Sequence, residues 1–175
     1  MAGTNLKLVS WNVRGMNDKV KRAIILDHLK KLKADIMLLQ ETHLVGQRVR
    51  SLNRSWLGPV FHAEYSTYSR GVAILFRKTT APKIEKIISD RYGRYIILKI
   101  TVYTKTIILA NIYSPPPGDL TILQTILGKV AELGDHPVYW LGDFNAVPDP
   151  TLDRLRPLKG DSRALGEWLN TPIPT

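Results

Sequence analysis

The sequence predicts an α+β protein in which two packed β-sheets carry helices on their outer faces. Three observations favour this class. Strand-like apolar segments outnumber helical ones, two of them are apolar enough to be covered on both faces, and turn residues separate most of them. No internal repeat or linker interrupts the 175 residues, so we expect a single domain over residues 1–175.

Strands and helices alternate in the first half of the chain. Leu6–Asn12 is rich in strand formers, and Ile36–Leu39 is a continuous apolar run, which is typical of a strand covered on both faces. Between them Asp18 can cap a helix. The apolar residues of that helix recur at helical spacing, at Val20, Ile24, Ile25, Leu29 and Leu32. A helix around Gln47–Trp56 and strands at Val60–Tyr65 and Gly71–Phe76 follow.

Strands dominate the second half. Three segments with strand-forming residues predict an antiparallel meander: Lys83–Ser89, Tyr95–Tyr103 and Thr106–Tyr113. An amphipathic helix over Leu120–Leu133 and a buried strand over Pro137–Leu141 come next. From residue 146 onward the chain is proline-rich and irregular, before a short helix around Arg163–Leu169.

The composition favours an anionic partner and excludes several classes of function. Twenty-five Lys and Arg against 15 Asp and Glu give a net charge of +10, which makes nucleic acid the preferred partner and an anionic membrane surface the weaker one. The absence of cysteine excludes disulfides and thiol catalysis. The N-terminus lacks the apolar region of a signal peptide, and no apolar run approaches the roughly 18 residues of a membrane span. We therefore expect a soluble intracellular protein without a membrane partner.

Polar side chains follow four of the predicted strands. If the strand ends share one edge, these side chains converge above the sheets, and carboxylates with amides suit a hard cation such as Mg²⁺. Such a cation could stabilise a phosphoryl oxygen or a leaving oxyanion. The residues are Asn12, Gln40 and Glu41, Asn111 and Tyr113, and Asp143 and Asn145.

Each of these residues also has an ordinary structural interpretation. Asn12 could terminate a strand in a turn, Glu41 could be a solvated charge, and Tyr113 could be a packed aromatic side chain. The segment "GDFN" at residues 142–145 could be a turn. The recurrence of the pattern at four strand ends favours the functional interpretation.

Five motifs in order resemble the endonuclease/exonuclease/phosphatase superfamily. They are "WNVRG", "ADIMLLQETHL", "GVAILF", "NIYSPP" and "LGDFNAVP". Their order is similar to the exodeoxyribonuclease III and apurinic endonuclease branch. The segments "LKLVSWNVRGMN", "KRAIILDHLKKLKADIMLLQETHL" and "TLDR" resemble most the endonuclease domains of long interspersed element (LINE) retrotransposons. The resemblance implies a four-layer α/β/β/α sandwich of two mixed sheets and a metal-dependent hydrolase that cuts phosphodiester bonds in DNA by nicking or abasic-site cleavage.

The resemblance also implies roles for individual residues. Glu41 would be the principal Mg²⁺ ligand, with Mn²⁺ as the alternative ion, and Asn12 would help to hold the metal and the scissile phosphate. Asp143 would position or deprotonate the attacking water, or complete the metal site. Asn145 and Tyr113 would hydrogen-bond the phosphate. Such chemistry is mostly positioning and charge neutralisation, which these residue types can supply.

One part of the family pattern has no counterpart in this sequence. The family has a further Asp and an "SDH"-like block with a general-base histidine near the end of the domain. The chain stops at Thr175 without that block, so we expect a fold incomplete at its C-terminus and weak cleavage. His43 follows Glu41 closely but is a poor substitute. The remaining histidines are expected to be structural, since no carboxylate partner is suggested by spacing for His62 or His136, and His28 falls on the first helix.

The basic composition and the resemblance together predict DNA as the partner, and hence a nuclear protein. Arg14 and Arg70 are candidates for contact with the DNA backbone, although both could be solvated surface arginines. The alternatives are a non-catalytic basic nucleic-acid-binding relic, or a phosphatase or ribonuclease of the same fold. A missing C-terminal part would leave an exposed sheet edge, so we expect self-association through "YIILKI" and "TIILANIY".

Overall fold

The computed structural model describes residues 5–116, 118–147, 149 and 152. They fall into two compact units, the first within Met1–Tyr113 and Pro137–Gly142 and the second within Ser114–His136 and Asp143–Thr175. The predicted helix around Arg163–Leu169 and most of "TLDR" lie outside the described residues. Among the described residues, no helix has the length and apolarity needed to cross a membrane. The single-domain assignment stays a prediction.

The first sheet brings the ends of two parallel strands to one edge. Its strands run in the order β1 (Leu8–Asn12), β2 (Ile36–Gln40), β4 (Val72–Phe76) and β3 (Val60–Ala63). Strand β1 is parallel to β2, and β4 is antiparallel to both of its neighbours. Asn12 pairs in register with Gln40, so the residues that follow β1 and β2 emerge at the same edge of the sheet.

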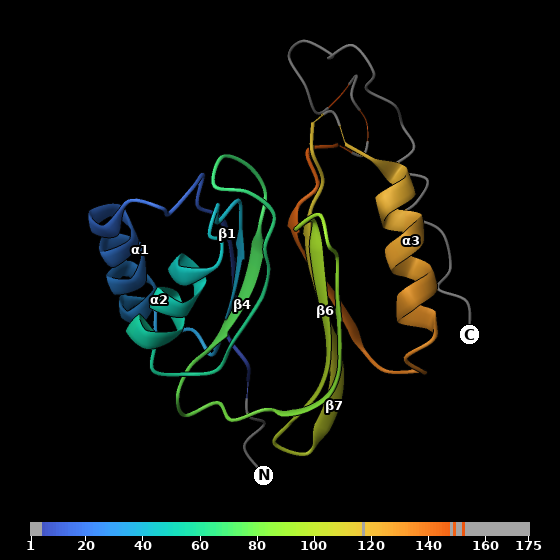
Figure 1. Cartoon of the computed structure of the whole chain (residues 1–175). Helices are drawn as coiled ribbons and strands as arrows, with labels where there is room; N and C mark the ends of the chain where they lie inside the picture. The colour runs from blue at the N-terminus through green and yellow to red at the C-terminus, as the bar shows by residue number, and fades with distance from the viewer. Residues whose placement is uncertain (1–4, 117, 148, 150–151, 153–175) are drawn as a thin grey trace. The chain divides into compact units, whose positions relative to one another are not determined.

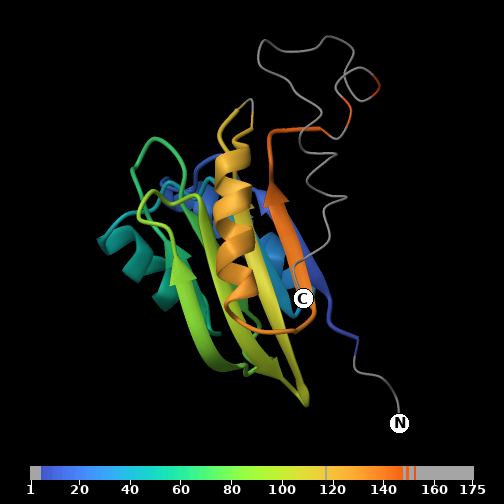
Figure 2. The same ribbon diagram turned by 90° about the vertical axis from the view of Figure 1, so that its right-hand side faces the viewer.

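The second sheet contains the predicted antiparallel meander. Its order is β5 (Lys83–Ser89), β6 (Tyr95–Val102), β7 (Lys105–Tyr113) and β8 (Val138–Asp143), with β6 antiparallel to β5 and to β7 (Figures 1 and 2). The expectation that β6 and β7 form an exposed edge is wrong. Both strands lie inside the sheet, because each pairs on both sides, and their apolar side chains are buried.

Two layers of apolar contacts hold the first unit together, and they explain why β2 and β4 are apolar throughout. On β2, Met37 and Leu39 face the helix side, whereas Ile36 and Leu38 pack against residues of β6 and β7. Side chains alternate between the two faces of a strand, so a strand between a helix layer and a second sheet needs apolar residues at every position. The predicted α+β class with two packed sheets is confirmed.

Helices α1 (Lys19–Lys31) and α2 (Gln47–Ser55) cover the outer face of the first sheet (Figure 1). Asp18 caps α1 by accepting a hydrogen bond from the N–H of Lys21, as predicted. The predicted apolar face is corrected, because Val20 and Ile24 are 67% and 64% exposed. The buried residues of α1 are Arg22, Ile25, Leu26 and Leu29, which follow the i, i+3, i+4, i+7 spacing of one helical face.

The second unit contains α3 (Leu120–Ala131), which matches the predicted helix except for its last two residues. Asp119 caps α3 by accepting a hydrogen bond from the N–H of Thr121. The buried side chains recur on one side of the helix, at Ile122, Leu123, Ile126 and Val130.

Candidate active site

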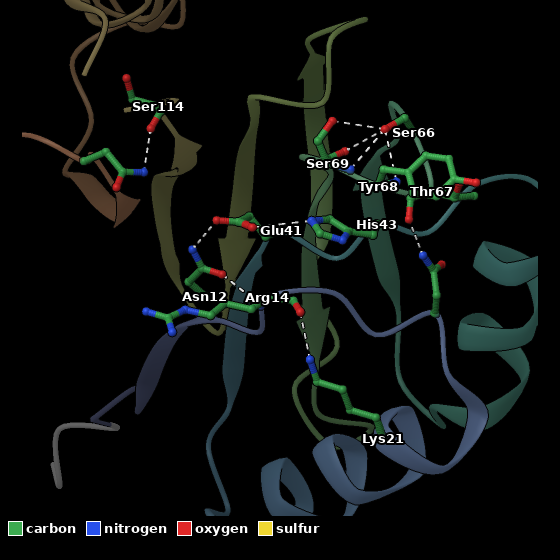
Figure 3. A network of polar contacts seen from close by, with 12 residues as sticks. Asn12, Arg14, Lys21, Glu41, His43, Ser66, Thr67, Tyr68, Ser69 and Ser114 are labelled. Atoms are coloured by element: carbon green, nitrogen blue, oxygen red, sulfur yellow. Dashed lines mark hydrogen bonds and ion pairs between the residues drawn. The ribbon is translucent and has the colours of Figure 1, made fainter. Parts of the chain in front are cut away.

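Asn12 and Glu41 meet at the edge where β1 and β2 end. The Nδ2 of Asn12 donates to Oε1 of Glu41 at 2.8 Å, and the Oδ1 of Asn12 accepts from the backbone N–H of Arg14 at 2.9 Å (Figure 3). The second bond fixes the orientation of the amide, because only its oxygen can accept from an N–H. The amide of Asn12 therefore holds the carboxylate of Glu41 in place.

His43 is the third member of this cluster. Its Nε2 lies 3.4 Å from Oε2 of Glu41, within ion-pair range, and is buried without a hydrogen bond in the described part of the protein. A buried polar atom that lacks a hydrogen bond is uncommon, and the polar group that Nε2 faces is the carboxylate of Glu41. The sequence placed His43 two residues after Glu41, and the structure brings its imidazole to that carboxylate. That His43 is a poor substitute for the general base stays a prediction.

A glycine makes the approach of His43 possible. A Cβ on Gly15 would lie 2.8 Å from Nδ1 of His43, closer than packed atoms tolerate, and the φ of Gly15 is +80°. Any other residue would therefore strain the backbone and displace the imidazole. The last residue of β1 thus carries the amide that binds Glu41, and the glycine in the loop that follows leaves room for His43.

Left-handed backbone conformations occur at several candidate site residues of both units. Seven non-glycine residues in the described ranges have positive φ, and five of them are candidate site residues or their direct neighbours. Such conformations cost free energy and persist where the surrounding structure imposes them, which is common at functional sites. The five residues are Arg14, Glu41, His43, Arg70 and Asn145.

Asp143 and Asn145 form a second cluster with Ser114, in the second unit. The backbone N–H of Asn145 donates to Oδ1 of Asp143 at 3.1 Å. The Nδ2 of Asn145 donates to the carbonyl of Ser114 at 2.8 Å, and Figure 3 draws this bond at Ser114. The N–H of Ser114 donates to the carbonyl of Asp143 at 2.9 Å. The segment after β8 is thereby fastened to the segment that follows Tyr113, which is the last residue of β7 and is 8% exposed.

The side chains of Gln40 and Asn111 are not exposed at the edge of the sheet, so the prediction that they join the polar residues at the strand ends is corrected. Both are buried, and Nε2 of Gln40 donates to Oδ1 of Asn111 at 2.7 Å. The Nδ2 of Asn111 donates to the carbonyls of Leu39 and Ala73, each at 2.9 Å. This amide pair ties β7 to β2 and β4 and is a structural feature of the core.

The two candidate arginines flank the Glu41 cluster. Arg14 is exposed and lies two residues after Asn12, whose Oδ1 accepts from its backbone N–H. The guanidinium of Arg70 lies over the ring of Tyr65 at 4.6 Å, and its carbonyl accepts from the N–H of His43 at 3.0 Å. Both arginines thus lie in backbone segments bonded to the cluster.

His28 and His62 take structural positions. The ring of His28 packs edge-on against Trp11 at 5.4 Å. His62 has a carboxylate partner after all, because Nε2 lies 4.0 Å from Oε1 of Glu64, two residues along the chain. Burial lowers the pKa of His62, and the charge of Glu64 opposes that shift only in part.

The residues 9–174 match the Endonuclease/Exonuclease/phosphatase family. The chain belongs to this family. Members of the family are hydrolases that act on phosphoester bonds, so the strand-end clusters are candidates for that chemistry. The family assignment confirms the superfamily that the five sequence motifs indicated.

Known structures share the fold of this family member. An AP endonuclease from Archaeoglobus fulgidus is 22% identical, with 94% of this chain and 70% of that one covered and a TM-score of 0.67. TDP2 from D. rerio, complexed with a single-strand DNA product, is 23% identical, with 81% and 61% covered and a TM-score of 0.60. ANGEL2, a 2′,3′-cyclic phosphatase in complex with adenosine-2′,3′-vanadate, is 18% identical, with 84% and 55% covered and a TM-score of 0.65. At these identities the likeness is one of fold.

Proposed function

We propose that this chain hydrolyses phosphodiester bonds in DNA as a Mg²⁺-dependent endonuclease of the retrotransposon type. The observation that carries the proposal is the carboxylate of Glu41, held by Asn12 and contacted by His43 in a family of phosphoester hydrolases. The net charge of +10 favours a polyanionic substrate over a small phosphate ester. The retrotransposon type and the nuclear location rest on the likeness of the motifs at residues 6–17 and 21–44 to LINE endonucleases.

The residues of the Glu41 cluster fit a hydrated divalent cation. No group of three or more His, Asp or Glu that could hold a metal occurs among the described residues. Mg²⁺ keeps several waters and needs as few as one or two carboxylates, so Glu41 with a partly exposed side chain suffices as an anchor. When bound, such an ion would neutralise charge on the phosphate and on the leaving oxygen. Mn²⁺, with the same preference for oxygen ligands, is the alternative ion.

The protein's own groups would position the phosphate and move the proton. We assign Asn12 to orienting Glu41, since its amide nitrogen faces the carboxylate. We assign Asp143 to accepting the proton of the attacking water, and Asn145 and Tyr113 to hydrogen bonds with the phosphate oxygens. The N–H of Asn145 already bonds Oδ1 of Asp143, which restrains that carboxylate. Preorganised donors and carboxylates of this kind stabilise a transition state without further rearrangement.

Arg14 and Arg70 would contact the DNA backbone on either side of the scissile phosphate. Backbone contacts position the protein on DNA without reading its sequence. If about four phosphates are neutralised, affinity should fall roughly a hundredfold between 50 and 200 mM salt. Binding that is insensitive to salt would contradict this part of the proposal.

A plasmid-nicking assay tests the proposed function. The chain should convert supercoiled DNA to the open circular form with Mg²⁺ or Mn²⁺, and not with EDTA. Asp143→Asn should abolish nicking while leaving DNA binding in EDTA intact, with Asp135→Asn as a matched control on an exposed turn. Metal-independent binding without any nicking would instead support the non-catalytic alternative.

A further inference from the structure

One exposed aromatic side chain stands out next to the Glu41 cluster. Tyr68 is 90% exposed, the highest value among the large apolar and aromatic side chains in the described ranges. Single exposed apolar residues are common and need no explanation by themselves. Tyr68 differs from such residues in the hydrogen bonds that hold its loop and in the arginine and tyrosine side chains of the neighbouring segments.

The loop of residues 66–69 is held in one conformation by hydrogen bonds. The Oγ of Ser66 accepts from the N–H of Tyr68 at 3.3 Å and from the N–H of Ser69 at 3.1 Å (Figure 3). The two serine hydroxyls are also bonded, at 3.1 Å. The backbone position of Tyr68 is therefore fixed before any ligand arrives, which lowers the entropy cost of binding.

The same loop is fastened to both segments that build the Glu41 cluster. The carbonyl of Thr67 accepts from Nδ2 of Asn17, in the segment that follows β1. The carbonyl of Arg70 accepts from the N–H of His43, in the segment that follows β2. Tyr68 thus projects from a loop whose two ends are tied to the candidate active site.

Arginines and further tyrosines continue this surface. Arg70 lies over Tyr65, and Arg91 and Arg94 lie over Tyr92 at 4.7 and 5.0 Å. Tyr65 and Tyr92 are 45% and 37% exposed, and their rings are 6.3 Å apart. Aromatic rings interleaved with guanidinium groups are the side chains that bind unpaired nucleic acid, by stacking on bases and neutralising phosphates.

The acidic groups in this region leave two of the arginines without an ionic partner. Asp90 is buried and paired with Arg94 at 2.7 Å. Glu64 accepts a hydrogen bond from the N–H of Gly46 at 2.6 Å. Within the described residues Arg70 and Arg91 form no ion pair, so their charges are available to a phosphate.

We propose that Tyr68 stacks on an unpaired base of a DNA strand while Arg70 and Arg91 contact the adjacent phosphates. The nature of the ligand rests on the proposed function. In a duplex both faces of each base are covered by neighbouring bases, so a tyrosine ring can stack only on an unpaired, extruded or terminal base. The subsite therefore selects single-stranded or locally unpaired DNA.

Binding measurements without hydrolysis test this inference. The full chain in EDTA at fixed low salt is titrated into an oligothymidylate of about 12 nucleotides that carries one 2-aminopurine, and into a blunt duplex of equal length. Tyr68→Ala should weaken single-strand binding about five- to a hundredfold and remove the quenching of 2-aminopurine. Tyr68→Trp should preserve both. Tyr103→Ala, which removes a tyrosine 57% exposed in the β6–β7 turn, should change neither.

The outcomes separate this inference from the proposed function. Unchanged single-strand affinity in Tyr68→Ala, an equal loss in Tyr103→Ala, or an equal loss on the duplex would overturn it. A wild-type chain that binds single strands through Tyr68 but never nicks DNA would refute the proposed function and leave the subsite standing. Nicking by a wild-type chain whose single-strand binding does not depend on Tyr68 would refute this inference and leave the proposed function standing.

Discussion

Replacing Glu41 by Gln is the sharpest test of the candidate active site. The amide is isosteric with the carboxylate and has an oxygen that can still accept from Nδ2 of Asn12 at 2.8 Å, so the loop should keep its shape. The change removes the negative charge at a side chain that is 23% exposed, and it places an NH2 group opposite Nε2 of His43. Loss of one preorganised electrostatic group typically costs about 10²- to 10³-fold in kcat, or about 2.7–4 kcal/mol. We expect a loss of nicking of that size at saturating Mg²⁺.

The control for this variant is Glu85→Gln. It makes the same change of charge on β5, where Oε1 accepts from Oγ1 of Thr101 at 2.7 Å. Both variants raise the net charge by one, so DNA binding in EDTA should be equal or slightly tighter in both. Nicking by Glu41→Gln within threefold of the wild type, or an equal loss in Glu85→Gln, would refute the assignment of Glu41.

Three further predictions concern the stability of the fold. Gly15→Ala should destabilise the fold by about 1 kcal/mol or more in urea unfolding, because φ is positive and the new Cβ would meet an imidazole, and it should reduce nicking. The control is Gly128→Ala in α3, where no atom of the described residues, apart from the helix's own backbone and the adjacent residues, lies within 4 Å of the new Cβ. It should stabilise the fold by about 0.5–1 kcal/mol in the same measurement. Asn111→Ala should cost about 1–3 kcal/mol, because it removes three side-chain hydrogen bonds from the core, although Gln40 keeps its bonds to Ser10 and Leu38. Because the pKa of His62 is lowered in the folded state, the unfolded chain takes up a proton first as pH falls below about 6.5. The stability of the fold should therefore decrease from that pH downward. Thermal melts compared between about pH 8 and 5 should show a less steep decrease for His62→Gln.

Most of the fold could be predicted because its signals are local. Apolar runs, turn residues and the Asp18 cap located, within a few residues, all eleven elements of the part of the chain that the structure describes. The apolar stripe of α1 was misassigned, since Val20 and Ile24 fit helical spacing as well as the true face does. The position of a helix relative to a sheet decides between two such faces, and that position is a property of the tertiary structure.

The sequence by itself determined the family and nominated residues for its chemistry, because a motif records which side chains follow each strand. Only the tertiary structure decided which of those side chains meet. It joined His43 to Glu41 and withdrew Gln40 and Asn111 into the core. It also tied the Tyr68 loop to the segments after β1 and β2. These contacts link residues far apart in the chain, or depend on left-handed backbone angles at Glu41 and His43, and local sequence preferences specify neither.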